Sequence, residues 1–310
     1  MQRVKIIGNG SCKGSQQFHF ATQTCHRLAE GETFWSLIDV AIEKALIKAD
    51  ISMQEIDCIV AAMATPLQLL PCNAAILHER YAYDMDIPAL DIDTSCTSFI
   101  TALDMISYMM QAGRYQRVLI VSGDHGSQGL NSEERESYEL FSDAATAFIV
   151  AFEPEEESAI IYSKQKTWSE GVHDTEIFGG GALLPAREIN ADNAARYLFH
   201  MEGVQVLRLS AQILPDFIAT CYREASVKRE EVALVIPHQA SRALGLIMKR
   251  LGYTPLEYVD RVAQYGNMIS AAIPYLFCQL IDEDRIKRGD LLVLVGTAAG
   301  LTANFMLLRY

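Results

Sequence analysis

The sequence lacks the features of fibrous, disordered or membrane-spanning proteins. Only 19 of its 310 residues are glycine and 9 are proline, whereas half are hydrophobic, which excludes collagen-like and disordered chains. No apolar run approaches the roughly 18 residues that a membrane helix needs. The first eight residues, MQRVKIIG, lack the long apolar stretch of a secretory signal. We therefore expect a cytoplasmic protein without a membrane partner.

Basic residues and paired cysteines are also scarce. The chain has 26 basic against 39 acidic residues, and its net charge of −13 argues against nucleic acid as the main partner. Its seven cysteines are an odd number and include no CxxC pair, which disfavours both a zinc site and a disulfide framework. Most of them are therefore expected to be small buried hydrophobic side chains.

Short apolar runs alternate with amphipathic stretches over a length that suits roughly two folding units. The runs that predict strands are Val4–Ile7, Ile56–Ala62, Ala89–Ile92, Val118–Ser122, Ala147–Ala151, Ala159–Ser163, Val232–Ile236, Leu291–Val295 and Thr302–Leu308. Helical periodicity covers Glu32–Ala49, Cys72–Tyr83, Thr97–Gln111, Val204–Ala225, Gln239–Leu251 and Ala271–Asp284. Such alternation predicts an α/β fold with mostly parallel strands and helices outside the sheets.

The chain also divides into two similar halves. Glu153–Glu157 holds four acids and a proline, which predicts a solvated turn and a junction between residues 1–157 and residues 158–310. Cys96 precedes Val118 by 22 residues and Asn267 precedes Leu291 by 24, each with a helix and a glycine between. This echo indicates an internal duplication. The irregular stretch 168–200 is typical of a functional or covering loop.

Three polar residues, Cys96, His238 and Asn267, each lie in a turn between a strand and a helix. A thiol at a helix N-terminus lies near unpaired N–H groups, which favour the thiolate. His238 follows a strand at the edge where open α/β sheets place their active sites. Taken singly, each has an ordinary structural explanation: a buried core cysteine, a histidine whose hydrogen bonds are made within the protein, and a turn asparagine. Together they are a candidate nucleophile with two polar partners.

Other catalytic motifs are missing. Gly123-x-x-Gly126-x-x-Gly129 follows a strand but lacks the spacing of a dinucleotide-binding loop. The sequence has no Walker lysine motif, no HExxH and no GxSxG. Any chemistry therefore depends on the thiol of Cys96.

Five segments resemble the β-ketoacyl-ACP synthase III family of the thiolase superfamily. They are Asp93–Phe99 around the cysteine, Phe141–Asp143, Val235–Ala240 around the histidine, Gly266–Pro274 around the asparagine, and the closing Gly296–Tyr310. Their order and separations match the family over nearly the whole chain. The resemblance implies a five-layered αβαβα thiolase fold of two pseudo-duplicated halves, usually in a homodimer.

The resemblance also implies a reaction. Cys96 accepts an acyl group from acyl-CoA or acyl-ACP, and the backbone N–H groups of Cys96 and Ala299 hold the thioester oxyanion. His238 and Asn267 then stabilise the enolate that forms when malonyl-ACP or malonyl-CoA loses CO₂. No metal or other cofactor is implied beyond CoA and phosphopantetheine thioesters, which are substrates.

The sequence departs from the family at four places. Ser11–Gly31 lacks the tryptophan and arginine that clamp the CoA adenine, and Trp35 belongs to the following helix. Alanines precede Gly300 in the closing motif, and Ser142 replaces a family glycine. Leu70 occupies a position that commonly reaches across the dimer into the acyl pocket of the partner. These departures indicate specialised metabolism rather than the initiation of housekeeping fatty acids.

The resemblance implies an acyl carrier protein as a partner. Because such carriers are acidic, we expect a basic docking surface on this chain. Arg242, Lys249 and Arg250 follow His238 on a predicted helix, where Arg242 and Lys249 lie near one face. Ordinary solvated charges are the alternative explanation for these residues.

Three other functions are compatible with the same residues. An acyltransferase would move the acyl group from Cys96 to a hydroxyl, amine or thiol, with His238 as general base. A non-catalytic subunit would support a catalytic paralogue in a heterodimer, and a simple cysteine hydrolase would release free acid. Retention of Asn267 favours condensation, because an acyltransferase needs it less.

Overall fold

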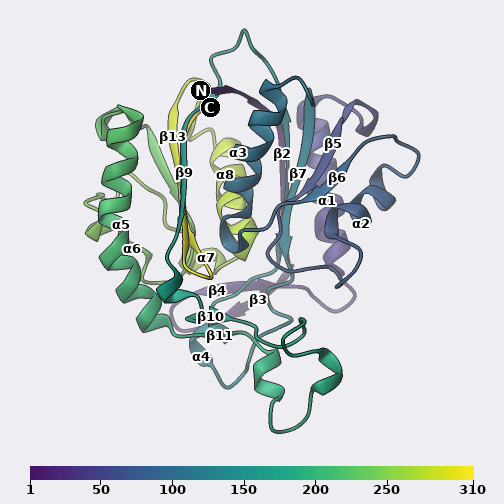
Figure 1. Ribbon diagram of the computed structural model, residues 1–310, viewed down its shortest axis with the longest axis vertical. Coiled ribbons are helices and arrows are strands. Elements are labelled where there is room, and N and C mark those ends of the chain that lie inside the picture. The colour runs from purple at the N-terminus through teal and green to yellow at the C-terminus, as the bar shows by residue number, and fades with distance from the viewer.

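Two mixed five-stranded sheets form the framework of the computed structural model, which describes residues 1–310 (Figure 1). The first sheet has the order β2 (Lys5–Lys13), β8 (Ala144–Ala151), β7 (Arg117–Asp124), β5 (Cys58–Ala61), β6 (Ala89–Asp91). The second has the order β1 (Gln2–Arg3), β9 (Ala159–Thr167), β14 (Thr302–Arg309), β13 (Leu291–Ala298), β12 (Leu234–Pro237).

Helices cover both sheets on both faces. The helices are α1 (Phe34–Ala49) and α2 (Asn73–Tyr81) outside the first sheet, α3 (Ser98–Gln111) and α8 (Ala272–Asp282) between the sheets, and α5 (Gly203–Ala225) and α6 (Leu244–Arg250) outside the second (Figure 1). Each layer buries an apolar face against the next. The predicted five-layered αβαβα arrangement is confirmed.

The two sheets share one topology. In chain order, β2, β5, β7 and β8 of the first sheet correspond to β9, β12, β13 and β14 of the second, with the same neighbours. The pairings also agree, since β5 and β7 are parallel, as are β12 and β13, and the other two pairs are antiparallel. This identity supports the internal duplication that the sequence indicates.

The structure aligns the residues of the two halves differently from the spacing seen in the sequence. A 3-10 turn, η2 (Ser95–Thr97), precedes α3, and a second one, η7 (Ile269–Ala271), precedes α8. Both begin with a non-glycine residue at positive φ, 54° at Ser95 and 52° at Ile269. Each of these residues lies 22 positions before the strand that follows its helix. Cys96 therefore corresponds to Ser270, three residues after Asn267.

The start of the chain contributes to both sheets. The sequence predicts one strand over Val4–Ile7, whereas β1 pairs with β9 of the second sheet and β2 pairs with β8 of the first. Val4, between them, is 2% exposed. The boundary after residue 157 stays a prediction, and Gln2–Arg3 belong to the sheet of the second half.

Several short elements complete the chain, among them a hairpin that the sequence did not indicate. They are β3 (Gln16–His19), β4 (Thr24–Arg27), α4 (Arg135–Tyr138), β10 (Thr175–Glu176), β11 (His200–Met201) and α7 (Val262–Tyr265). The β3–β4 hairpin packs through Arg27, whose guanidinium lies 4.9 Å from the ring centre of Phe18 and 4.6 Å from that of Tyr138. No helix has both the length and the apolar character needed to cross a membrane.

The helix after His238 begins later than predicted. The Gln239 side chain donates to the carbonyls of Pro237 and Val259 and accepts from the Arg261 N–H, which holds the chain in a loop. The helix α6 therefore begins at Leu244 rather than at Gln239. Arg242 lies in the turn before α6, and its predicted place on the same helical face as Lys249 is wrong.

A substitution at Phe148 of β8 can test the packing between the sheets. Its ring centre lies 4.8 Å from that of Phe99 on α3 and 5.6 Å from that of Phe277 on α8, and the side chain is fully buried. Phe148→Ala leaves a cavity there, so we expect urea unfolding to show a loss of about 3–5 kcal/mol. The control Leu256→Ala, at a side chain that is 91% exposed, is expected to change stability by less than about 0.5 kcal/mol. Equal effects of the two substitutions would contradict this account.

Candidate active site

Cys96 lies in a strained turn between β6 and α3. Ser95 has positive φ although it is not glycine, a conformation that costs free energy and is retained only when neighbours enforce it. The Asp93 carboxylate accepts a hydrogen bond of 2.6 Å from the Ser95 N–H, and the Ser98 hydroxyl donates to the Ser95 carbonyl at 2.7 Å. These bonds fix the direction of the residue that follows.

The thiol of Cys96 is protonated at neutral pH, contrary to the thiolate expected from its position. Burial raises the pKa of Cys96 to about 11, and the charge of Asp124 adds to this effect. The Ser95 hydroxyl and the backbone N–H groups of Ala299 and Cys96 face the sulfur and lower the pKa, but by less than burial raises it. Two backbone N–H groups therefore lie near the sulfur.

His238 is a buried, neutral imidazole. It follows β12, and its N–H donates to the Val295 carbonyl of the neighbouring strand at 2.8 Å. Only 4% of the residue is exposed, and burial lowers the pKa of His238 to about 4. Its Nδ1 is buried and makes no hydrogen bond within the chain. The ring is therefore available to a substrate as a neutral donor.

Asn267 is tied to the loop of His238. Its Nδ2 donates to the carbonyl of Ala240 at 3.0 Å, and its Oδ1 accepts from the N–H of Ile269 at 2.8 Å. Because an amide carries two N–H donors, one remains for a ligand. Ser142 holds the same segment, since its hydroxyl donates to the carbonyl of Tyr265 at 2.6 Å.

Gly296 of β13 lies where the three motifs meet. A Cβ built at this glycine would lie 2.7 Å from the Cβ of His238, 3.3 Å from Cγ2 of Thr97 and 3.1 Å from Cδ1 of Ile273. Thr97 is the neighbour of Cys96, and Ile273 belongs to the helix that follows Asn267. The structure thus brings the predicted cysteine, histidine and asparagine segments to one edge of the molecule.

Two buried polar residues that the sequence analysis missed support these segments. Asp124, at the end of β7, accepts hydrogen bonds from the N–H and hydroxyl of Thr65 and from the N–H and hydroxyl of Ser270. Asn304 of β14 donates to the hydroxyl of Thr97 at 2.8 Å. A carboxylate two residues after a predicted buried strand was the available signal for Asp124, and nothing in the sequence marks Asn304.

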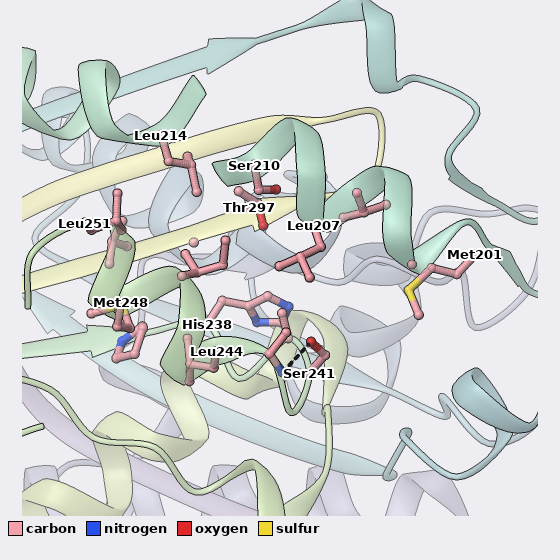
Figure 2. Close-up of a pocket in the computed structure, with 18 of the residues that line it drawn as sticks. Met201, Leu207, Ser210, Leu214, His238, Ser241, Leu244, Met248, Leu251 and Thr297 are labelled. Carbon is pink, nitrogen blue, oxygen red and sulfur yellow. Dashed lines mark hydrogen bonds between the residues drawn. The ribbon is translucent and has the colours of Figure 1, made fainter. Parts of the chain in front are cut away.

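Two cavities flank the candidate site. The small cavity, of about 200 Å³, lies between α5, α6 and the end of β13 and includes Gly296 and Thr297. Figure 2 shows the ring of His238 directed into it between Leu207 and Leu244. The large cavity, of about 990 Å³, includes Ser95 and Ala299, which adjoin Cys96 on the other side. His238 therefore lines the small, mostly apolar cavity, whereas Ser95 and Ala299 line the large one.

The residues predicted to reach the partner subunit or to bind the carrier protein lie outside the two cavities. Leu70 is 83% exposed, on a loop whose neighbours Gln68 and Leu69 reach the rim of the large cavity. Arg242, Lys249 and Arg250 are exposed. On α6, the opposite side, with Leu244 and Met248, lines the small cavity.

Trp35 belongs to α1, as predicted. The guanidinium of Arg80 lies 5.0 Å from its ring centre. Trp35 lines the large cavity and not the small one.

Comparisons with known proteins agree with this geometry. Residues 90–169 match the family model "3-Oxoacyl-[acyl-carrier-protein (ACP)] synthase III", and residues 222–310 match its C-terminal counterpart. The chain is 30% identical to β-ketoacyl-[acyl-carrier-protein] synthase III of Clostridium perfringens over 275 residues, 87% of this chain and 84% of that protein. It is 30% identical to the Aquifex aeolicus protein of that name over 285 residues, 92% of this chain and 86% of that one.

Solved structures extend the similarity to nearly the whole chain. The 3-oxoacyl-[acyl-carrier-protein] synthase III of Aquifex aeolicus superposes with a TM-score of 0.86 at 26% identity, covering 99% of this chain and 100% of that one. OleA of Xanthomonas campestris, with a TM-score of 0.84 at 17% identity over 100% of this chain and 99% of that one, shares the fold.

The fold defines a thiolase-like condensing enzyme. The chain belongs to the β-ketoacyl-ACP synthase III family. Its class is therefore that of the 3-oxoacyl-ACP synthase III acyltransferases of fatty acid biosynthesis.

The low pKa of His238 predicts a pH-dependent stability. The unfolded chain binds a proton at His238 as the pH falls through about 6.5, whereas the folded chain stays neutral there until about 4, so acid lowers the free energy of unfolding. By pH 4.5 this site accounts for a loss of about 2 kcal/mol. His238→Gln removes the loss, and urea unfolding at pH 7 and pH 4.5 measures it.

His19→Gln, at an exposed residue of β3, is the control for this experiment. We expect the control to lose as much stability in acid as the unchanged protein does. An unchanged acid sensitivity in His238→Gln would contradict the buried neutral state.

Proposed function

We propose that the protein transfers an acyl group from a CoA or ACP thioester to Cys96 and then condenses it with a malonyl thioester, with loss of CO₂. One observation carries this proposal: the amide of Asn267 is bonded through one N–H to the loop of the buried neutral His238, which leaves its second N–H for a ligand, and the N–H group of Ala299 lies near Cys96. Cys96, His238 and Asn267 are the catalytic residues of this proposal.

The first step is acyl transfer to sulfur. Cys96 Sγ attacks the thioester carbonyl, and the N–H groups of Cys96 and Ala299 stabilise the oxyanion. The bond from the carbonyl carbon to the donor sulfur then breaks. The departing thiol takes the proton that Cys96 loses, which suits a nucleophile that starts as a neutral thiol.

The second step forms the carbon–carbon bond. The bond between the malonyl α-carbon and its carboxylate breaks, CO₂ leaves, and the electron pair forms an enolate on the thioester. Neutral N–H donors from His238 and Asn267 stabilise that charge without protonating the carbon. The α-carbon attacks the acyl carbonyl on Cys96, the sulfur leaves and regains a proton, and a β-ketoacyl thioester is released.

The proposal places the enzyme in specialised rather than housekeeping metabolism. Trp35 lies on α1 at the large cavity, so it is not placed to clamp an adenine at the small one. Ala298 and Ala299 narrow the turn beside the oxyanion hole. The large cavity receives the acyl chain, and the small one receives the phosphopantetheine arm.

A homodimer is part of the same proposal. The edge strand β6 leaves one side unpaired, which suits pairing with a second copy. Leu69 and Leu70 form an exposed apolar tip on a nearby loop. In the dimer, Leu70 reaches the acyl cavity of the partner subunit, where an aliphatic side chain in place of an aromatic one admits a longer chain.

Intact-protein mass spectrometry tests the acyl step. After incubation with acyl-CoA and acyl-ACP donors, we expect a mass increase of one acyl group, which Cys96→Ser abolishes. His238→Ala and Asn267→Ala are expected to acquire the acyl group but to form β-ketoacyl product about 10²–10³-fold more slowly, because each removes one donor to the enolate.

The same experiment separates the alternative functions. Full condensation by Asn267→Ala would sink the proposed mechanism. Transfer to a hydroxyl, amine or thiol without CO₂ release would identify an acyltransferase instead. A chain that never acquires an acyl group would be a supporting subunit.

The basic residues after His238 test carrier docking. Arg242→Glu places an acid where an acidic carrier would bind, so we expect KM for malonyl-ACP to rise about tenfold and KM for malonyl-CoA to stay constant. Arg285→Glu is the control, because Arg285 is exposed just beyond α8, near the opposite ends of the strands. An equal change in KM for malonyl-ACP and for malonyl-CoA in Arg242→Glu would exclude Arg242 from docking.

A further inference from the structure

The large cavity has a polar region that an alkyl chain would leave unpartnered. Most of its wall is apolar, with Ile177 and Phe199 among the lining side chains. His125, Gln128 and Glu176 line it as well. Simple burial of a hydrocarbon chain does not need these groups, so they point to a polar substituent on the ligand.

The orientation of the His125 ring is fixed from two sides. It lies parallel to the ring of Phe34, with 14° between the planes and 6.3 Å between the centres. Its Nε2 is 3.8 Å from Oδ2 of Asp143, a distance too long for a hydrogen bond. The Asp143 carboxylate is fully buried, and it accepts hydrogen bonds from the N–H of Leu28 and from the N–H and hydroxyl of Ser127.

The His125 ring thus makes no hydrogen bond to Asp143, and His125 lines the cavity. About a third of the side chain is exposed, at 33%. The packing against Phe34 and the position of Asp143 keep the ring in place before anything binds. Such a preorganised polar group adds specificity at low entropic cost.

Glycines keep the space beside His125 open. A Cβ built at Gly126 would lie 2.9 Å from Cδ1 of Ile269, and one at Gly129 would lie 3.4 Å from Cδ1 of Ile177. Any larger side chain at Gly126 would therefore collide with the wall or fill the cavity. The same cavity includes Ser95, the neighbour of Cys96, so a chain attached to that sulfur can extend toward His125.

The charges around His125 favour an uncharged substituent. Glu176, whose carboxylate is bonded to Nδ1 of His173, lines the cavity, and Asp143 lies behind the imidazole. The lining includes no lysine or arginine that could pair with a carboxylate on the acyl chain. An unsubstituted chain would desolvate the imidazole without replacing its hydrogen bonds to water. A hydroxyl both donates and accepts, so it pairs with either neutral form of the ring.

We propose that the large cavity selects acyl groups that carry a hydroxyl on the chain over unsubstituted groups of equal length, and that His125 determines this preference. The inference rests on the proposed function, because it assigns the acyl chain to this cavity. His125 contacts the substituent and takes no part in bond formation.

Matched pairs of acyl donors test the inference. Straight-chain acyl-CoA thioesters of six to twelve carbons are compared with isomers hydroxylated at successive positions, and the rate at which Cys96 gains mass is measured. We expect at least one hydroxylated isomer to react about tenfold faster than its unsubstituted partner. In His125→Phe, which keeps the ring packed on Phe34, we expect this ratio to fall to about one, because the hydroxyl loses its partner and the unsubstituted chain no longer desolvates an imidazole.

A binding measurement separates this inference from the proposed reaction. Primary amides of the same acyl chains cannot transfer an acyl group, so calorimetry with the unchanged protein reports selectivity even if Cys96 is never acylated. His19→Phe, the same substitution at an exposed histidine, is the control and should keep the preference. Equal affinity for both kinds of amide, or a preference that persists in His125→Phe, would overturn the inference.

Discussion

The buried carboxylate of Asp124 is the interaction on which the site depends. It accepts hydrogen bonds from Thr65 in the first half of the chain and from Ser270 in the second, with no exposure to solvent. Burial raises the pKa of Asp124 to about 6, and the bonds from Ser270 and Thr65 oppose that rise. An unpaired carboxylate would be costly at this depth, so the donors from both halves hold the site edge together.

Much of the fold follows from local sequence, and the exceptions have physical reasons. The alternation of apolar runs and helical periods predicts every long strand and helix, because burial imposes those periods. The β3–β4 hairpin escaped prediction because its polar sequence is stabilised by distant contacts, such as the stacking of Arg27 on Tyr138. The late start of α6 has the same kind of cause, since Gln239 is held by hydrogen bonds to residues such as Arg261.

The sequence singles out the residues of the candidate site but not their ionisation. Strand-to-helix turns and the resemblance to a known family single out Cys96, His238 and Asn267, whose segments the structure brings together. The protonated state of Cys96 depends on burial by many neighbours, which no local motif records. The result is a site without formal charge on its thiol, imidazole or amide, suited to charge that develops only on the substrate.

The position of β1 in the second sheet has a consequence for how the two repeats fold. The chain begins in the sheet of the second half and then enters that of the first, and its first and last strands, β1 and β14, lie on either side of β9 (Figure 1). A half cut at the junction would leave β9 without its edge neighbour and would expose the helices shared between the sheets. The repeats are therefore no longer separable modules, because neither can cover its apolar surfaces without the other.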